Sequence, residues 1–184
     1  MLIPLGFWAA SAGGGAAGSF DLLETQVLSS SAASVTFSGL SAYAADYQHL
    51  QIRVALSSGP ARYGLRFNGA SSVGNYAFHY LFGSGSSVLS GGSSGGTTFT
   101  SAITCGIGTT LASSSVIDIL DPFETTKNTT IRSLSGVSTQ LALWSGVWLN
   151  TNSTTSIEIL GTENPTLNFA VGSRFSLYGI KAGA

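Results

Sequence analysis

Residues 47–68 read YQHLQIRVALSSGPARYGLRFN and contain two alternating patterns separated by a turn. Every second residue from Leu50 to Leu56 is a large aliphatic, and this period of two is typical of a strand with one buried face. Residues 57–60 favour a turn, and the alternation resumes from Tyr63 to Phe67. We therefore expect an antiparallel hairpin whose apolar face must be covered by a second sheet.

Short alternating segments of the same kind recur on both sides of this stretch. They are expected at residues 23–27, 35–37, 75–82, 97–107, 116–120, 129–134, 141–149, 156–160 and 174–181. The first two should pair as a hairpin around residues 29–33, whereas residues 40–46 are long enough for only one helical turn. No segment keeps a helical period over three turns. We therefore predict an all-β protein, an antiparallel β-sandwich of jelly-roll type with about 8–11 strands.

Two segments in the middle of the chain depart from simple alternation. In residues 75–82, aromatic residues alternate with Ala77, His79 and Leu81, so both faces are apolar and we expect a strand covered on both sides. Residues 83–96 consist almost entirely of Gly and Ser, a composition that favours a long mobile loop.

The 184 residues are enough for one domain with a substantial core, but the chain is poor in charge. Only 8% of residues are charged and the net charge is -1, which gives no electrostatic attraction to nucleic acid or to an anionic membrane. Either subunit contacts bury much of the surface, the interpretation we favour, or the surface stays soluble through hydroxyl groups. Cys105 is the only cysteine, so neither an intrachain disulfide nor a paired-cysteine metal site is expected.

Residues 1–19 differ in composition from the rest of the chain. Ten largely apolar residues, MLIPLGFWAA, are followed by Gly, Ala and Ser, and no Lys or Arg precedes the apolar part as in a secretory leader. We interpret residues 1–19 as an anchor arm with a flexible linker and residues 20–184 as a single β-sandwich domain. A terminus that folds back onto its own domain is the alternative. The arm residues expected to bind a partner are Leu2, Ile3, Leu5, Phe7 and Trp8.

Two pairs of titratable residues are candidates for chemistry. His49 and His79 are the only histidines, and a shared metal or a catalytic base is less common for strand histidines than an ordinary hydrogen bond. Asp118 and Asp121 flank a turn and can bind calcium, but an Asp121 that accepts backbone hydrogen bonds is the more common arrangement. No G-x-S-x-G nucleophile motif is present. We predict no catalytic residue, cofactor or metal site, and hence no enzyme.

The aromatic residues allow two interpretations. They can form a carbohydrate-stacking surface, but most alternate in a way that favours burial in the core. The residues concerned are Tyr43, Tyr47, Tyr63, Tyr76, Tyr80, Trp144 and Trp148. The arginines are isolated from one another, so we expect ion pairs with the few acids, within or between subunits, rather than a phosphate site. The residues in question are Arg53, Arg66, Arg132 and Arg174.

Several sequence blocks occur in an order that resembles a known family. The blocks are IPLGFWAA, HLQIR, LRFNG, NYAFHYLFGSGSS, VIDILDP, KNTTIRSLSG, SGVWLN and the terminal GSRFSLYGIK. Together they cover most of the chain and resemble small structural proteins of tailed phages, especially marine and cyanobacterial phages. The resemblance implies a virion component without enzymatic activity or catalytic residues.

The resemblance and the composition together lead to a functional expectation. We expect a capsid decoration (cement) protein that forms a homotrimer on the outer surface of the phage head, with the arm bound to the major capsid protein or to a neighbouring copy. The alternative is a tail-fibre or tail-tip module that contacts host glycans. A secreted lectin-like or hydrolytic sandwich has the least support.

Overall fold

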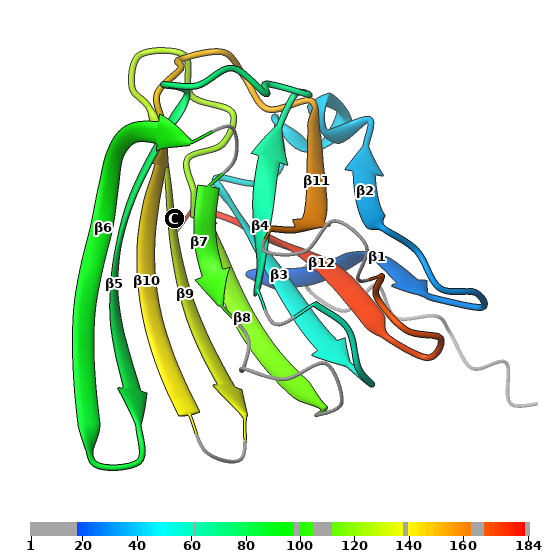
Figure 1. The fold of residues 1–184 in the computed structure, drawn as a ribbon. Helices are drawn as coiled ribbons and strands as arrows, with labels where there is room; N and C mark the ends of the chain where they lie inside the picture. The colour runs from blue at the N-terminus through cyan, green and yellow to red at the C-terminus, as the bar shows by residue number, and fades with distance from the viewer. Residues whose placement is uncertain are drawn as a thin grey trace, which may run out of the picture.

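The computed structural model of this protein describes residues 18–60, 62–97, 100–104, 112–137, 140–162 and 168–182. These residues form two antiparallel sheets packed face to face, as Figure 1 shows, which confirms the predicted all-β sandwich. The strands are β1 (Phe20–Val27), β2 (Ser34–Ser38), β3 (His49–Leu56), β4 (Arg62–Phe67), β5 (Tyr76–Ser84), β6 (Ser87–Thr97), β7 (Thr100–Thr104), β8 (Ser113–Leu120), β9 (Thr129–Val137), β10 (Gln140–Trp148), β11 (Ser156–Gly161) and β12 (Arg174–Ile180). The expected helical turn is the 3-10 helix η1 (Leu40–Tyr43).

The strand order is that of a jelly roll with two added hairpins. The larger sheet runs β1-β12-β3-β8-β9-β10-β5-β6 and the smaller sheet runs β2-β11-β4-β7. Without β5, β6, β9 and β10, the remaining orders β1-β12-β3-β8 and β2-β11-β4-β7 are those of two Greek keys folded together. We call the four added strands the hairpin extension, because they lengthen only the larger sheet (Figure 1).

The expected hairpin between residues 50–56 and 63–67 is wrong. β3 pairs with β12 and β8, whereas β4 pairs with β11 and β7 in the other sheet. The expected faces are nevertheless correct, because the aliphatic side chains of β3 and the side chains of Tyr63, Leu65 and Phe67 all lie in the core. When the two strands belong to opposite sheets, the apolar face of each covers the other. Two neighbouring strands of one sheet would present their apolar faces to the same side and would leave both uncovered without a second sheet.

The expected hairpin between residues 23–27 and 35–37 is wrong for the same reason. β1 pairs with β12 at one edge of the larger sheet, and β2 pairs with β11 in the smaller sheet. The connection crosses from one sheet to the other and is fixed by an isolated bridge between Ala32 and Phe169.

The core contains the large aromatic side chains. Trp148 stacks on Phe67, with ring centroids 5.4 Å apart and an interplanar angle of 14°. The hydroxyl of Tyr76 donates to the carbonyl of Ala70 and accepts from the amide of Phe67, and burial raises the pKa of Tyr76. Tyr63, Tyr76, Trp144 and Trp148 are all buried, so for these four residues the core interpretation is confirmed.

The expected loop at residues 83–96 is wrong, because β6 occupies most of this segment. A turn with Gly85 at φ +59° connects β5 to β6, and Gly91 and Gly92 lie beside aromatic rings of β5. A Cβ atom at Gly91 would lie 2.5 Å from the hydroxyl of Tyr80, and one at Gly92 would lie 2.5 Å from Cδ2 of His79. The glycines therefore leave space for the rings of the neighbouring strand. With β6, the described residues form twelve strands.

Candidate interaction face

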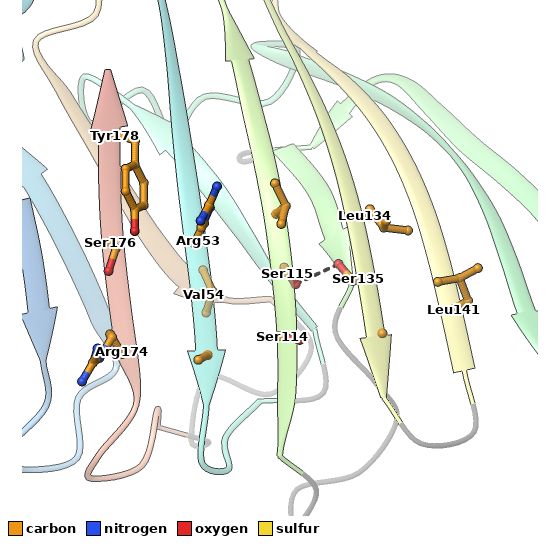
Figure 2. Close-up of a pocket in the computed structure, with 13 residues that line it drawn as sticks. Arg53, Val54, Ser114, Ser115, Leu134, Ser135, Leu141, Arg174, Ser176 and Tyr178 are labelled. Atoms are coloured by element: carbon orange, nitrogen blue, oxygen red, sulfur yellow. Dashed lines mark hydrogen bonds between the residues drawn. The ribbon is translucent and has the colours of Figure 1, made fainter. Parts of the chain in front are cut away.

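The outer face of the larger sheet is the face turned away from the smaller sheet, and it carries a shallow groove of about 530 Å³. Figure 2 shows the groove, which five adjacent strands line, from β12 across β3, β8 and β9 to β10. One end is basic and aromatic, and the other end is aliphatic. The lining side chains that the argument uses are Arg53, Val116, Leu134, Leu141, Arg174 and Tyr178.

Arg53 forms the basic end of the groove together with Arg174. The guanidinium of Arg53 lies 5.0 Å from the ring centroid of Phe20 and 4.8 Å from that of Tyr178, and the two rings stack on each other. Its Nε atom donates to the Gln51 side chain at 3.0 Å. Within the described part of the chain no carboxylate forms an ion pair with Arg53 or Arg174, so for these two arginines the expected ion pair is not found within one subunit.

The other two arginines form ion pairs as predicted. Arg66 binds Glu158 at 2.7 Å, and Nε of Arg132 binds Asp118 at 2.9 Å. The second pair lies on the outer face next to the aliphatic end of the groove, where β8 and β9 are neighbours. The charges of β8 and β9 on this face therefore neutralise each other.

The aliphatic end belongs to a larger surface, which we call the outer apolar patch. The register places Val116 opposite Leu134, Leu134 opposite Leu143, and Leu143 opposite Leu81, across four neighbouring strands. Val88 and Leu141 flank this row on the same face. The patch consists of Leu81, Val88, Val116, Leu134, Leu141 and Leu143, each between 39% and 78% exposed. A solvent-facing side of an antiparallel sheet is normally polar, so this side is unusual.

Beneath the groove, buried hydroxyl groups connect the two sheets. The Tyr63 hydroxyl donates to Oγ of Ser115 at 2.7 Å, and Ser115 donates to Oγ of Ser135 at 2.9 Å. Both serines are almost completely buried and face the core rather than the groove. Their hydroxyls therefore satisfy one another in the interior, as buried polar groups normally do.

The two histidines are far apart in the sheet. β3 carries His49 and β5 carries His79, and β8, β9 and β10 lie between them. Nδ1 of His49 accepts the amide hydrogen of Asp121 at 3.0 Å and lies 3.3 Å from Oδ1 of the Asp121 carboxylate. These positions exclude a site shared by the two histidines.

Asp118 and Asp121 serve different partners. Asp118 contacts Arg132 and Gln51, whereas Asp121 contacts Gln48 and Lys127. The hydrogen bond from Lys127 is the main cause that lowers the pKa of Asp121, and the same bond raises the pKa of Lys127. The predicted turn is present, with Asp121 at φ +51° and its backbone carbonyl accepting the amide of Glu124. Among the described residues no group of three acids, histidines or cysteines is placed to bind a metal.

Sequence reasoning missed the outer apolar patch. Its six residues come from segments far apart in the chain, and each segment read separately shows only one or two unremarkable aliphatics. A usable signal was present at residues 141–149, where Leu141 and Leu143 alternate with the buried Ala142 and Trp144, so that neither face is polar. β5 likewise has no polar face. We expected it to be covered on both sides, but in the single chain its outer face is uncovered, as the 54% exposure of Leu81 shows.

The predicted anchor residues lie outside the described part of the chain. They are Leu2, Ile3, Leu5, Phe7 and Trp8. In the part of the chain that the structure covers, no helix is both long and apolar enough to cross a membrane. Neither the models of known protein families nor the curated protein sequences match this chain.

Proposed function

We propose that this chain is a non-enzymatic structural protein of a phage particle, a decoration protein that binds as a homotrimer to the outer surface of the head and stabilises it. The observation that carries the proposal is the outer apolar patch, a half-exposed aliphatic surface on a regular sheet. Surfaces of this kind mark contacts with other proteins. The ordered sequence blocks resemble those of phage structural proteins, and this resemblance supports the assignment of the chain to a phage particle.

The surroundings of the groove support a role without catalysis. Ser115, Ser135 and Ser176 are buried hydroxyls that line the groove, and all three are engaged in hydrogen bonds, the first two in the core and Ser176 with Thr25. Asp118 forms an ion pair with Arg132, and Asp121 forms one with Lys127. His49 accepts a backbone hydrogen bond. An activated nucleophile needs a base within hydrogen-bond reach, and the described groups of the groove do not provide that pair.

In this proposal the arm anchors the domain to the shell. Burial of its apolar side chains against the capsid protein or a neighbouring copy would contribute about 25 cal/mol per Å² of apolar area. The full-length protein should bind purified heads that lack it, whereas the Phe7→Asp/Trp8→Asp double variant should fold but bind at least tenfold more weakly. Undiminished binding by the variant would count against the anchor, and absence of wild-type binding to heads would overturn the proposal.

The groove favours the tail-fibre role as the second candidate. Its basic end, with Arg53, Arg174 and Tyr178, has the charge and the ring that an anionic host glycan requires. Purified protein that blocks phage adsorption to cells, and that remains on tails rather than on tailless heads, would assign the protein to the tail.

A further inference from the structure

Three adjacent strands of the hairpin extension carry no formal charge. β10, β5 and β6 have nine, nine and eleven residues, and none of these is Asp, Glu, Lys or Arg. The charged residues of the outer face, such as Arg53, Asp118 and Arg132, belong to the other strands. A free sheet surface normally carries charged residues for solubility, so three adjacent strands without a formal charge are unusual.

The exposed aliphatic side chains of the extension form a continuous layer. Leu143 lies between Leu134 and Leu81, its direct neighbours on the two adjacent strands. Side chains in such positions have Cβ atoms about 4.5–5.5 Å apart, so they present one uninterrupted surface. Beside this row a hollow of about 650 Å³, lined by Leu81, Ser90 and Leu143, leaves room for side chains of a partner.

The area of this surface is of the size that subunit interfaces use. Five strands, from β8 to β6, at about 4.8 Å spacing and roughly eight residues at about 3.3 Å rise give a face of roughly 600 Å². A specific interface buries about 800 Å² on each partner. This face, which combines the outer apolar patch with polar neighbours such as Ser145 and His79, therefore approaches the size of a standard interface, with the patch as its centre and the polar residues as its rim.

We propose that a second copy of this chain covers the outer apolar patch, so that the hairpin extension is the contact between subunits. This inference deepens the proposed function, because it names the surface through which the copies of the homotrimer meet. A second copy fits better than a charged partner because β10, β5 and β6 offer no charge that would select one. It also explains why β5 is apolar on both faces although a single chain covers it only in part.

Charged substitutions in the patch test the inference on the full-length protein. In sedimentation velocity the wild type should be an oligomer, and Leu81→Glu and Leu143→Glu should each sediment as monomers with an unchanged circular dichroism spectrum. The positions are half-exposed, so the monomer tolerates the charge, whereas a buried unpaired carboxylate opposes association. Val171→Glu is the matched control, because Val171 is 57% exposed but lies in the turn before β12, and it should remain an oligomer.

Three results would overturn the inference. They are a wild type that is monomeric at every soluble concentration, an oligomer that persists in both patch variants, and a control that dissociates as readily as they do. If the glutamate substitutions unfold the chain, the milder Leu81→Gln and Leu143→Gln variants are measured instead. Each should associate more weakly than the wild type. A monomeric wild type that still binds phage heads, with binding lost in the patch variants, would assign the patch to the capsid protein and leave the decoration role standing without the homotrimer.

Discussion

The phenolic hydroxyl of Tyr63 on β4 donates across the sandwich to Oγ of Ser115 on β8, with 2.7 Å between the two oxygens. Both residues are buried. The bond therefore joins the two sheets directly beneath the groove of the outer face.

Replacement of Tyr63 by phenylalanine should lower the stability of the fold. The Tyr63→Phe variant removes the buried hydrogen bond to Ser115, which should reduce the free energy of unfolding by about 1–2 kcal/mol. Urea denaturation followed by tryptophan fluorescence measures this change. Tyr178→Phe is the control, because Tyr178 is partly exposed and its ring rather than its hydroxyl makes the contacts with Phe20 and Arg53, and it should change stability by less than about 0.5 kcal/mol.

Trp148→Ala should be among the most destabilising single substitutions in the core. Trp148 is completely buried and stacks on Phe67, so its removal leaves a large cavity between the sheets. We expect a loss of about 3–5 kcal/mol in the free energy of unfolding, measured by denaturant titration. A loss below 1 kcal/mol would show that this stack is not part of the stable core.

Gly92 should not tolerate even a methyl group. A Cβ atom there would lie 2.6 Å from the backbone carbonyl oxygen of Phe78, so the strand itself must shift. We expect Gly92→Ala to lower the free energy of unfolding by about 1–3 kcal/mol. Gly83→Ala on the neighbouring strand is the control, because its nearest contact would be 3.9 Å away, and an equal loss in both variants would disprove the steric explanation.

The contact between Asp121 and Lys127 should make stability depend on pH. The folded state lowers the pKa of Asp121 below its ordinary 3.8, chiefly through the hydrogen bond from Lys127. A depressed carboxyl pKa contributes stability that is present above 3.8 and is lost as the pH falls through the folded value. Lys127→Met should therefore be less stable than the wild type near neutral pH and equally stable in strong acid, where Asp121 is protonated in both proteins.

The raised pKa of Lys127 makes stability depend on pH in the opposite direction. Its contribution is present below 10.5 and is lost as the pH rises through the folded value. Thermal unfolding of both proteins across the pH range measures the two limits. A difference between wild type and Lys127→Met that stays constant from strong acid to neutral pH would show that the ion pair does not stabilise the fold.

Most of the strands could be predicted from the sequence because alternation is a local property. The buried positions of β3, from Leu50 to Leu56, follow directly from the period of two, and β8 with its Asp121 turn follows in the same way. β6 could not be predicted, because its glycines serve Tyr80 and His79 on another strand. From composition alone, a glycine-rich segment is predicted to be a loop. Here glycine is favoured within a strand because an aromatic ring of the neighbouring strand lies close to its backbone.

The candidate surface could not be predicted from single segments. Leu134, Leu143 and Leu81 lie on three different strands, and they become neighbours only because the β9–β10 hairpin pairs with β5. Arg53 and Tyr178 likewise meet only because β3 pairs with β12. The sequence predicted ion pairs within or between subunits for all four arginines discussed, and within the chain the structure places Arg53 beside two aromatic rings.

By itself the amino-acid sequence determined an all-β fold, the buried face of most strands and the low charge of the molecule. Tertiary structure decided which strands are neighbours, that β3 and β4 belong to opposite sheets, and that two hairpins extend only one sheet. The physical reason is that side-chain alternation specifies which face of a strand is buried, whereas backbone hydrogen bonds join almost any two strands equally well. The choice of partner is therefore made by the packing of the whole chain.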